Sequence, residues 1–596
     1  MKIALVDTGV NKSHPQLRNY NIVNYQIETQ GGKVAIKKGG EDDYGHGTAV
    51  CGIILNHCPE VEVLSFQMYK SGIDSEDLFA VLNYIHFHYT VSIIHLSIGC
   101  QMCCDLNKFK LLCHEIVESG CLIVAAYDNE GSMSYPASFE CVIGVDWSNA
   151  CKGKNDTIFI EKSKINILAK GINQRVLWNR DSKYMIVSGS SFAAAHVTGI
   201  ILSKMAESDH EKNTNILQET LDILRNNSFE TINMSIPEDT PKASSYGNIG
   251  LFPLNKEIES ILCFHDQVIG EITHIFDVRF FGRIGQKINE LIYTKDDYDI
   301  EVENVEYLDK FLPEIDTMVI GFTEEIKAVV GVDYKNEILE LCRKENVKCF
   351  FLDEVPEFCT YRNVYSPKIG KRHIRVDNFQ KLRVIGVPIL MIAGTSSKQG
   401  KFSLQLSLRK YFEENFYKVG QWATEPQAQL FGIDEVLPTG YGSHLDLPEK
   451  ELIEIVNYQL GNIEDKGCDI IIAGTQSFQL PYNLIHANMY PAFQNAIISA
   501  LQPDAILLCV NMHDELEYIR RTINYMEAVT MGKVVGIAVF PVRKKRTWSA
   551  TEFVSSIVPV DEIKFFLADL EEKIKVKTFC IDDVEQIGNT VIDYFE

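Results

Sequence analysis

Short apolar runs alternate with longer segments of helical periodicity over the first 258 residues of the chain. The runs, among them IALVDT, VEVLSF, SIIHLSIG, CLIVAAY and CVIGVD, are apolar almost throughout, which is typical of strands buried on both faces. Apolar residues three and four positions apart predict helices over residues 75–89, 108–120 and 191–207. This alternation predicts a parallel sheet with helices on both faces.

The same alternation returns twice later in the chain. Residues 259–385 repeat it with DTMVIGF, NEILELCRKENV and KCFFLDEV, and end in a polar connector that contains Pro367 and Gly370. Residues 386–596 open with a strand, a glycine loop and a helix. A chain of 596 residues is too long for one hydrophobic core. We therefore predict an α/β protein of three domains: a parallel-sheet domain over 1–258, a Rossmann-like unit over 259–385 and a third α/β domain over 386–596.

Composition and charge exclude several classes of partner. The formal net charge of -24 repels a phosphate backbone, and the only basic run is Arg543 to Arg546, so we expect no nucleic-acid partner. No segment has the ~18 unbroken apolar residues of a membrane span. The 16 cysteines are scattered, and an apolar strand follows Met1 directly, so we expect a cytoplasmic protein with reduced thiols. The cluster Cys100 to Cys104 has no second ligand pair, so no metal site is expected.

Four polar residues follow predicted strands or open predicted helices. Asp7 ends the first strand, and His46 lies in DDYGHGTAVCGII between two glycines. Asn129 follows the strand of LIVAAYDNEGS, and Ser191 opens an alanine-rich helix in SGSSFAAAHVTG. Peptide hydrolysis by serine needs a hydroxyl nucleophile, an imidazole base, a carboxylate that orients the base and donors for the oxyanion. The carboxyl ends of parallel strands gather such groups at one edge of a sheet.

In residue type and order these segments resemble the subtilases, the subtilisin family of serine proteases. Further matches are SYPASF and YGNIGLF, which resembles the family's closing segment, so that the resemblance covers residues 1–258. It implies that Asp7, His46 and Ser191 form a catalytic triad and that Asn129 holds the oxyanion. It also implies a substrate-binding strand and a specificity pocket, formed by Ser97, Ile98, Gly99, Asp128 and Glu130. Asp128 stands where subtilisins commonly have glycine, and we expect it to favour Lys or Arg before the scissile bond. Because Asp7 lies so near Met1, neither a strong calcium site nor a prosegment is expected.

A second motif lies in the last domain. The loop from Gly394 to Gly400, followed by Lys401 and Ser403, stands between a strand and a helix, where loop N–H groups and a lysine can hold phosphate. Five residues separate the two glycines, so the loop resembles the dethiobiotin-synthetase-like branch of P-loop proteins. We expect ATP or GTP with Mg²⁺ here. Phe402 occupies the usual hydroxyl position, and Glu425 is the substitute carboxylate for the metal. Asn511 and Asp514 in LCVNMHD are candidates to bind the base, and the alternative is a structural loop at the end of a strand.

The preferred interpretation is a cytosolic endopeptidase that cleaves a peptide precursor, such as the leader of a ribosomally made natural product. Residues 259–596 resemble P-loop proteins that accompany bacterial peptide-maturation systems, on the segments GTSSKQGKFSLQL, TEPQAQLFG and QPDAILLCVN. Two alternatives remain open. One is a nucleotide-dependent ligase or kinase that acts on a peptide, and the other is a nucleotide-gated binding scaffold.

Overall fold

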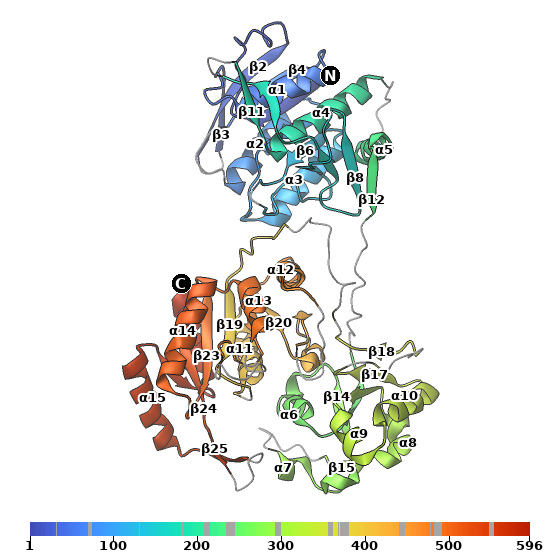
Figure 1. The fold of residues 1–596 in the computed structure, drawn as a ribbon, viewed down its shortest axis with the longest axis vertical. Helices are drawn as coiled ribbons and strands as arrows, with labels where there is room; N and C mark the ends of the chain where they lie inside the picture. The colour runs from blue at the N-terminus through green and yellow to red at the C-terminus, as the bar shows by residue number, and fades with distance from the viewer. Residues whose placement is uncertain are drawn as a thin grey trace. The chain divides into compact units, whose positions relative to one another are not determined.

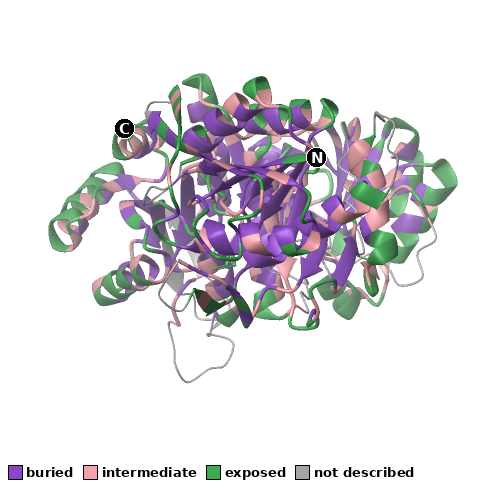
Figure 2. Cartoon of the chain, turned by 90° about the horizontal axis from the view of Figure 1, so that it is seen from above, coloured by how far each residue is buried: buried purple, intermediate pink, exposed green. Residues whose placement is uncertain are grey.

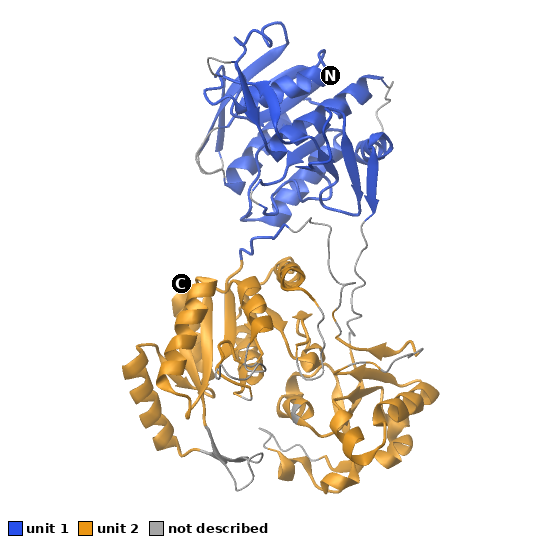
Figure 3. Cartoon of the chain, viewed as in Figure 1, with its two compact units in different colours: residues 1–236, 375–386 blue, residues 237–374, 387–596 orange. Residues whose placement is uncertain are grey.

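The computed structural model divides the chain into two compact units. Unit 1 comprises Met1–Ile236 and Arg375–Gly386, and unit 2 comprises Pro237–Ile374 and Val387–Glu596 (Figure 3). The structure describes residues 1–30, 33–68, 74–129, 131–179, 183–207, 215–233, 245–292, 300–353, 355, 361–367, 369, 381–397, 399–439, 447–476, 478–481, 491–546 and 553–596.

The described part of unit 1 contains a ten-stranded sheet in the order β12-β8-β9-β7-β6-β5-β1-β4-β2-β3. Figure 1 draws its strands in blue to green. Its strands are β1 (Lys2–Asp7), β2 (Ile22–Gln30), β3 (Lys33–Lys38), β4 (Glu62–Gln67), β5 (Ile93–Leu96), β6 (Leu122–Ala126), β7 (Ile143–Trp147), β8 (Thr157–Glu161), β9 (Ile167–Ala169) and β12 (Glu230–Asn233). Neighbouring strands run parallel except for β2 with β3 and β8 with β9. A separate antiparallel ribbon pairs β10 (Gln174–Leu177) with β11 (Tyr184–Val187).

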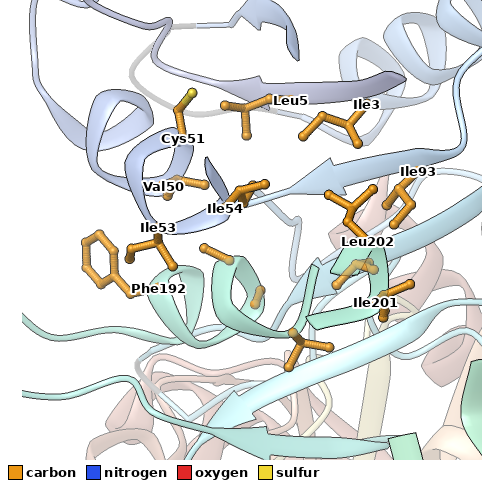
Figure 4. Packing of buried hydrophobic residues seen from close by; sticks show 14 of the residues in the cluster. Ile3, Leu5, Val50, Cys51, Ile53, Ile54, Ile93, Phe192, Ile201 and Leu202 are labelled. Carbon is orange, nitrogen blue, oxygen red and sulfur yellow. The ribbon is translucent and has the colours of Figure 1, made fainter. Parts of the chain in front are cut away.

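Helices cover both faces of this sheet, as the apolar runs predict. The helices are α1 (His46–His57), α2 (Ser75–His88), α3 (Leu106–Glu118), α4 (Ser190–Glu207) and α5 (Ile216–Asn227). Successive side chains of a strand point to opposite faces. Ile3 and Leu5 of β1 therefore pack in the cluster that includes α1 and α4, which Figure 4 shows, whereas Ala4 and Val6 pack in the cluster that includes α2 and α3.

The described residues of unit 2 form two large sheets and a two-stranded hairpin. The first is parallel, in the order β15-β14-β13-β16-β17-β18, which is the strand order 3-2-1-4-5-6 of doubly wound dinucleotide folds. Its strands are β13 (Asn248–Phe252), β14 (Glu271–Asp277), β15 (Val302–Asn304), β16 (Thr317–Ile320), β17 (Lys348–Phe351) and β18 (Val364–Tyr365). Its α-helices are α6 (Lys256–Cys263), α7 (Ile288–Leu291), α8 (Leu308–Phe311), α9 (Glu324–Val330) and α10 (Tyr334–Glu345).

The second sheet of unit 2 is also parallel and has the order β21-β20-β22-β19-β23-β24-β27. Its strands are β19 (Ile389–Gly394), β20 (Val419–Ala423), β21 (Glu435–Val436), β22 (Ile470–Gly474), β23 (Ala505–Asn511), β24 (Lys533–Phe540) and β27 (Thr578–Cys580). Its helices are α11 (Lys401–Glu414), α12 (Glu449–Glu464), α13 (Ala492–Leu501), α14 (Leu516–Thr530), α15 (Val560–Ile574) and α16 (Val584–Phe595). A hairpin of β25 (Val542–Arg546) and β26 (Phe553–Ile557) follows β24. The strands of the sheets are largely buried (Figure 2).

The α/β fold class agrees with the prediction, but two predicted boundaries differ. The segment YGNIGLF, expected to close the first domain at residue 258, contains β13, which pairs with β14 and β16 in unit 2. An apolar run of this kind fits any parallel sheet, so its sequence does not show which sheet it joins. Residues 381–385, expected to end the second domain, belong to unit 1. No helix in the described ranges is long and apolar enough to cross a membrane.

Candidate functional site

Asp7 and His46 are hydrogen-bonded at the carboxyl end of the unit 1 sheet. Asp7 is the last residue of β1 and is 1% exposed, and its Oδ1 accepts from His46 Nδ1 at 2.8 Å and from the Thr8 N–H at 2.7 Å. Burial by itself raises the pKa of the Asp7 carboxyl, but His46 and the Thr8 N–H outweigh it and hold that pKa below its usual range. Burial lowers the pKa of His46, but the Asp7 carboxylate outweighs burial and raises that pKa. The pair is thus arranged to stabilise a protonated imidazole.

A turn held by a buried acid positions His46. Gly45 adopts φ 111°, and a Cβ on Gly47 would lie 2.1 Å from the Gly9 carbonyl oxygen, so α1 can begin this close to β1 only with glycine at position 47. Asp42 is fully buried and accepts from the Gly45 N–H at 2.7 Å and the Thr48 N–H at 2.9 Å. The sequence analysis did not single out Asp42. The sequence signal that could have indicated this residue is an acid four positions before the histidine in DDYGHG.

Ser191 and Asn129 meet at the amino end of α4. Ser191 is the second residue of α4 and is 7% exposed, and its hydroxyl donates to the Ser97 carbonyl at 3.4 Å. Asn129 follows β6, and its Oδ1 accepts from the Ser190 N–H at 2.9 Å. That bond anchors the amide through its oxygen, so its NH₂ group is the part that can donate to a substrate oxygen. The strand order β6-β5-β1 therefore brings the ends that carry Asn129, Ser97 and Asp7 to one edge of the sheet.

The predicted substrate strand follows β5. Ser97, Ile98 and Gly99 come directly after Leu96, and the Ser97 hydroxyl contacts His95 Nε2 at 3.0 Å. Cys100, the next residue, pairs with Tyr135 through two backbone hydrogen bonds of 2.9 and 2.8 Å.

Asp128, predicted to line the specificity pocket, precedes Asn129. Gln101 Nε2 and the Ser132 N–H both donate to its carboxylate at 3.3 Å. Glu130, the other predicted pocket acid, lies outside the described residues. The expected preference for Lys or Arg therefore stays a prediction.

The glycine loop of unit 2 lies between β19 and α11. Gly394 ends β19, Gly400 caps α11 with φ 72°, and Ser403 lies in the first turn of α11. Lys401 is 7% exposed, and its amine donates to the Ser396 carbonyl at 2.7 Å, so it folds back over the loop. β19 pairs with β22 and β23 on its two sides, so the loop stands where ligands bind in doubly wound sheets.

Three more residues proposed for nucleotide contacts lie near this loop or near the end of β22. Asn511 Nδ2 donates to Ser396 Oγ at 2.9 Å, and Asp514 accepts from the Asn511 N–H at 2.8 Å. Both residues therefore lie beside the loop, and a role in binding the base stays a prediction. Glu425 Oε1 accepts from Gln476 Nε2 at 3.3 Å, which places this carboxylate beside the end of β22.

Comparison with known proteins assigns the first unit. Residues 1–236 match the Subtilase family. The major intracellular serine protease of Bacillus subtilis (strain 168) is 30% identical over 222 residues, which are 34% of this chain and 67% of that protein. An intracellular serine protease of Paenibacillus polymyxa is 26% identical over 234 residues, with 36% of this chain and 69% of that protein covered. A solved DUF1611 family protein from Anabaena variabilis aligns with 59% of this chain and 99% of its own, at 15% identity and a TM-score of 0.43. Through its residues 1–236 the chain belongs to the Subtilase family, and it is a serine endopeptidase.

Proposed function

We propose that this endopeptidase cleaves a peptide precursor in the cytoplasm, as in leader removal from a ribosomally made natural product, and that unit 2 adds a nucleotide-binding module. The observation that carries the proteolytic part is the buried 2.8 Å hydrogen bond from His46 to Asp7 at the sheet edge that also holds Ser191. The precursor as substrate is supported by the resemblance of residues 259–596 to proteins of peptide-maturation systems. The cytoplasmic location is supported by the two intracellular relatives.

We propose a role for each residue of the site. Ser191 Oγ attacks the scissile carbonyl, and His46 Nε2 takes the hydroxyl proton and returns it to the leaving amine. Asp7 holds the Nδ1–H tautomer and stabilises the imidazolium. The Asn129 NH₂ group and the Ser191 N–H, at the positive end of α4, donate to the oxyanion.

The nucleotide-binding part rests on the loop of unit 2. The residues fit a phosphate group: the loop precedes a helix N-terminus, and the buried Lys401 amine lies over the loop, where it donates to the Ser396 carbonyl. Lys401 would hold the phosphates, while Ser403 and Glu425 would face the magnesium ion. Bound nucleotide would supply phosphate charge that orders the loop.

Cleavage of a full-length candidate precursor, followed by mass spectrometry, tests the proposal. Wild type should release the leader, Ser191→Ala should not, and Ser203→Ala, a matched change on the same helix, should leave cleavage intact. Lys401→Ala should abolish nucleotide binding without abolishing cleavage of short peptides. A precursor that gains mass in a Lys401-dependent step would instead favour the ligase or kinase. Binding of precursor and nucleotide without any turnover would favour the scaffold.

A further inference from the structure

A short segment from outside the family-matched residues docks in unit 1 beside the loop that follows β6 and carries Asn129. We call this loop the oxyanion loop. Lys381 belongs to unit 1 although it lies 253 residues after Asp128 in the chain. Its side chain is 10% exposed, and its amine lies 3.0 Å from the Asp128 carbonyl and 3.1 Å from Asp146 Oδ2. The neighbouring Leu382 forms a parallel β-bridge with Ser132, and its carbonyl accepts from the Met133 N–H at 3.0 Å. We call residues 381–383 the strap.

The loop that contacts the strap carries Asn129, one of the two proposed oxyanion donors. The Asp128 carbonyl immediately precedes Asn129, and the Asp128 N–H donates to Ser134 Oγ at 3.2 Å. Asn129 Oδ1 in turn accepts from the Ser190 N–H, and the Ser190 hydroxyl donates to the Tyr127 carbonyl. The backbone of residues 127–129 thus links the strap to the start of α4. A displacement of about 1 Å in the groups that position the reaction lowers the rate about 100-fold.

The charges of the contact show why the lysine matters. The Asp146 side chain is 13% exposed. Burial raises the pKa of the Asp146 carboxyl, and the nearby Lys381 amine partly offsets this rise. The Lys381 amine also lies 5.8 Å from the centre of the buried Tyr127 ring. A carboxylate, a carbonyl and an aromatic face are together a site for a cation, and removing the cation leaves a buried acid without its counter-charge.

We propose that Lys381 is a positioning residue for the oxyanion loop, so that the endopeptidase depends on a strap that lies between the two parts of unit 2 in the chain. This inference rests on the proposed roles of Asn129 and Ser191. Positioning is favoured over blockage because the strap contacts the loop while Asn129 stays exposed and the His46 side chain is 21% exposed.

Kinetics on a short chromogenic peptide provide the first test, with the full-length chain. Lys381→Met should lower kcat about 10- to 100-fold with KM changed less than about twofold, because the donors are displaced rather than the peptide site. Lys381→Arg should recover part of kcat. Leu382→Ala, whose backbone contacts persist, is the matched control and should match wild type. The double variant Lys381→Met with Asp146→Asn removes the unpaired charge and should fold normally, yet keep the low kcat.

Hydrogen exchange gives a second readout that does not depend on proteolysis. In the Ser191→Ala background, Lys381→Met should speed amide exchange in peptides covering residues 127–134 and leave peptides from α2 unchanged. The proposal would be overturned if Lys381→Met left exchange unchanged and the double variant kept the wild-type kcat. A rise in kcat would also overturn it, because the strap would then inhibit the enzyme. If the wild-type protein cuts no peptide, the proposed function is refuted. The exchange result still decides whether the strap holds the oxyanion loop in place.

Discussion

Replacing Asp7 with asparagine should disable the enzyme while leaving its fold intact. The carboxylate accepts from His46 Nδ1 at 2.8 Å and from the Thr8 N–H at 2.7 Å, so His46 is held with its proton on Nδ1 and Nε2 free to accept. An amide of the same shape can present its NH₂ group to Nδ1 instead. His46 would then carry its proton on Nε2, where it cannot accept the proton of the Ser191 hydroxyl.

The burial of the pair sets the size of the effect. Asp7 is 1% exposed, so water screens its attraction to a protonated His46 far less than it screens a surface pair, which is worth about 0–1 kcal/mol. In a serine protease of unrelated fold the same exchange lowers kcat about 10⁴-fold. That loss corresponds to about 5.5 kcal/mol, at about 1.36 kcal/mol for each tenfold step. We expect a loss of this order for Asp7→Asn.

A pH profile of kcat/KM on a short peptide tests the reasoning. His46 is active only when neutral, and Asp7 raises its pKa, so wild-type activity should be lost as pH falls through a value above about 6.5. In Asp7→Asn, only the weaker attraction of Asp42 still opposes the effect of burial on the pKa of His46, so the residual activity should persist to lower pH. Asp43→Asn makes the same chemical change at an exposed position of the nearby turn and should behave as wild type. A loss below tenfold, or an acid limb that does not move, would refute the assignment of Asp7.

Three further predictions concern other residues. Asn129→Ala should lower kcat about 100- to 1000-fold with little change in KM, as a lost oxyanion donor does, and steady-state kinetics showing a purely KM effect would contradict that role. Lys401→Ala should remove calorimetric binding of ATP or GTP with Mg²⁺, and no binding by wild type would end the nucleotide proposal. Burial lowers the pKa of His95 to about 4 and that of His196 to about 3, so the unfolded chain binds protons first as pH falls below about 6.5. Urea denaturation should show a stability loss of about 2 kcal/mol per histidine between pH 8 and pH 5, reduced in His196→Gln but not in the exposed His88→Gln.

The sequence by itself determined the elements and the catalytic candidates, because both leave local signals. A strand buried on both faces must be apolar at nearly every position, so β1 and β6 are visible as runs, and the chemistry requires particular residue types directly after them. The α4 helix is visible from its periodicity, and Ser191 from its place at the start of that helix. The predicted order of Asp7, His46, Asn129 and Ser191 needed no knowledge of contacts.

Tertiary structure alone decided which segments and side chains contact one another. The apolar segment of β13 fits any parallel sheet, and only its hydrogen bonds with β14 and β16 place it in unit 2. Asp42 has the local appearance of a loop acid and acquires its role through burial against the Gly45 and Thr48 amides. Lys381 lies in a polar stretch with no motif, and its partners Asp128 and Asp146 are more than two hundred residues away. Charge pairing across such a separation depends on chain folding, since neither partner's neighbours in sequence carry information about the other.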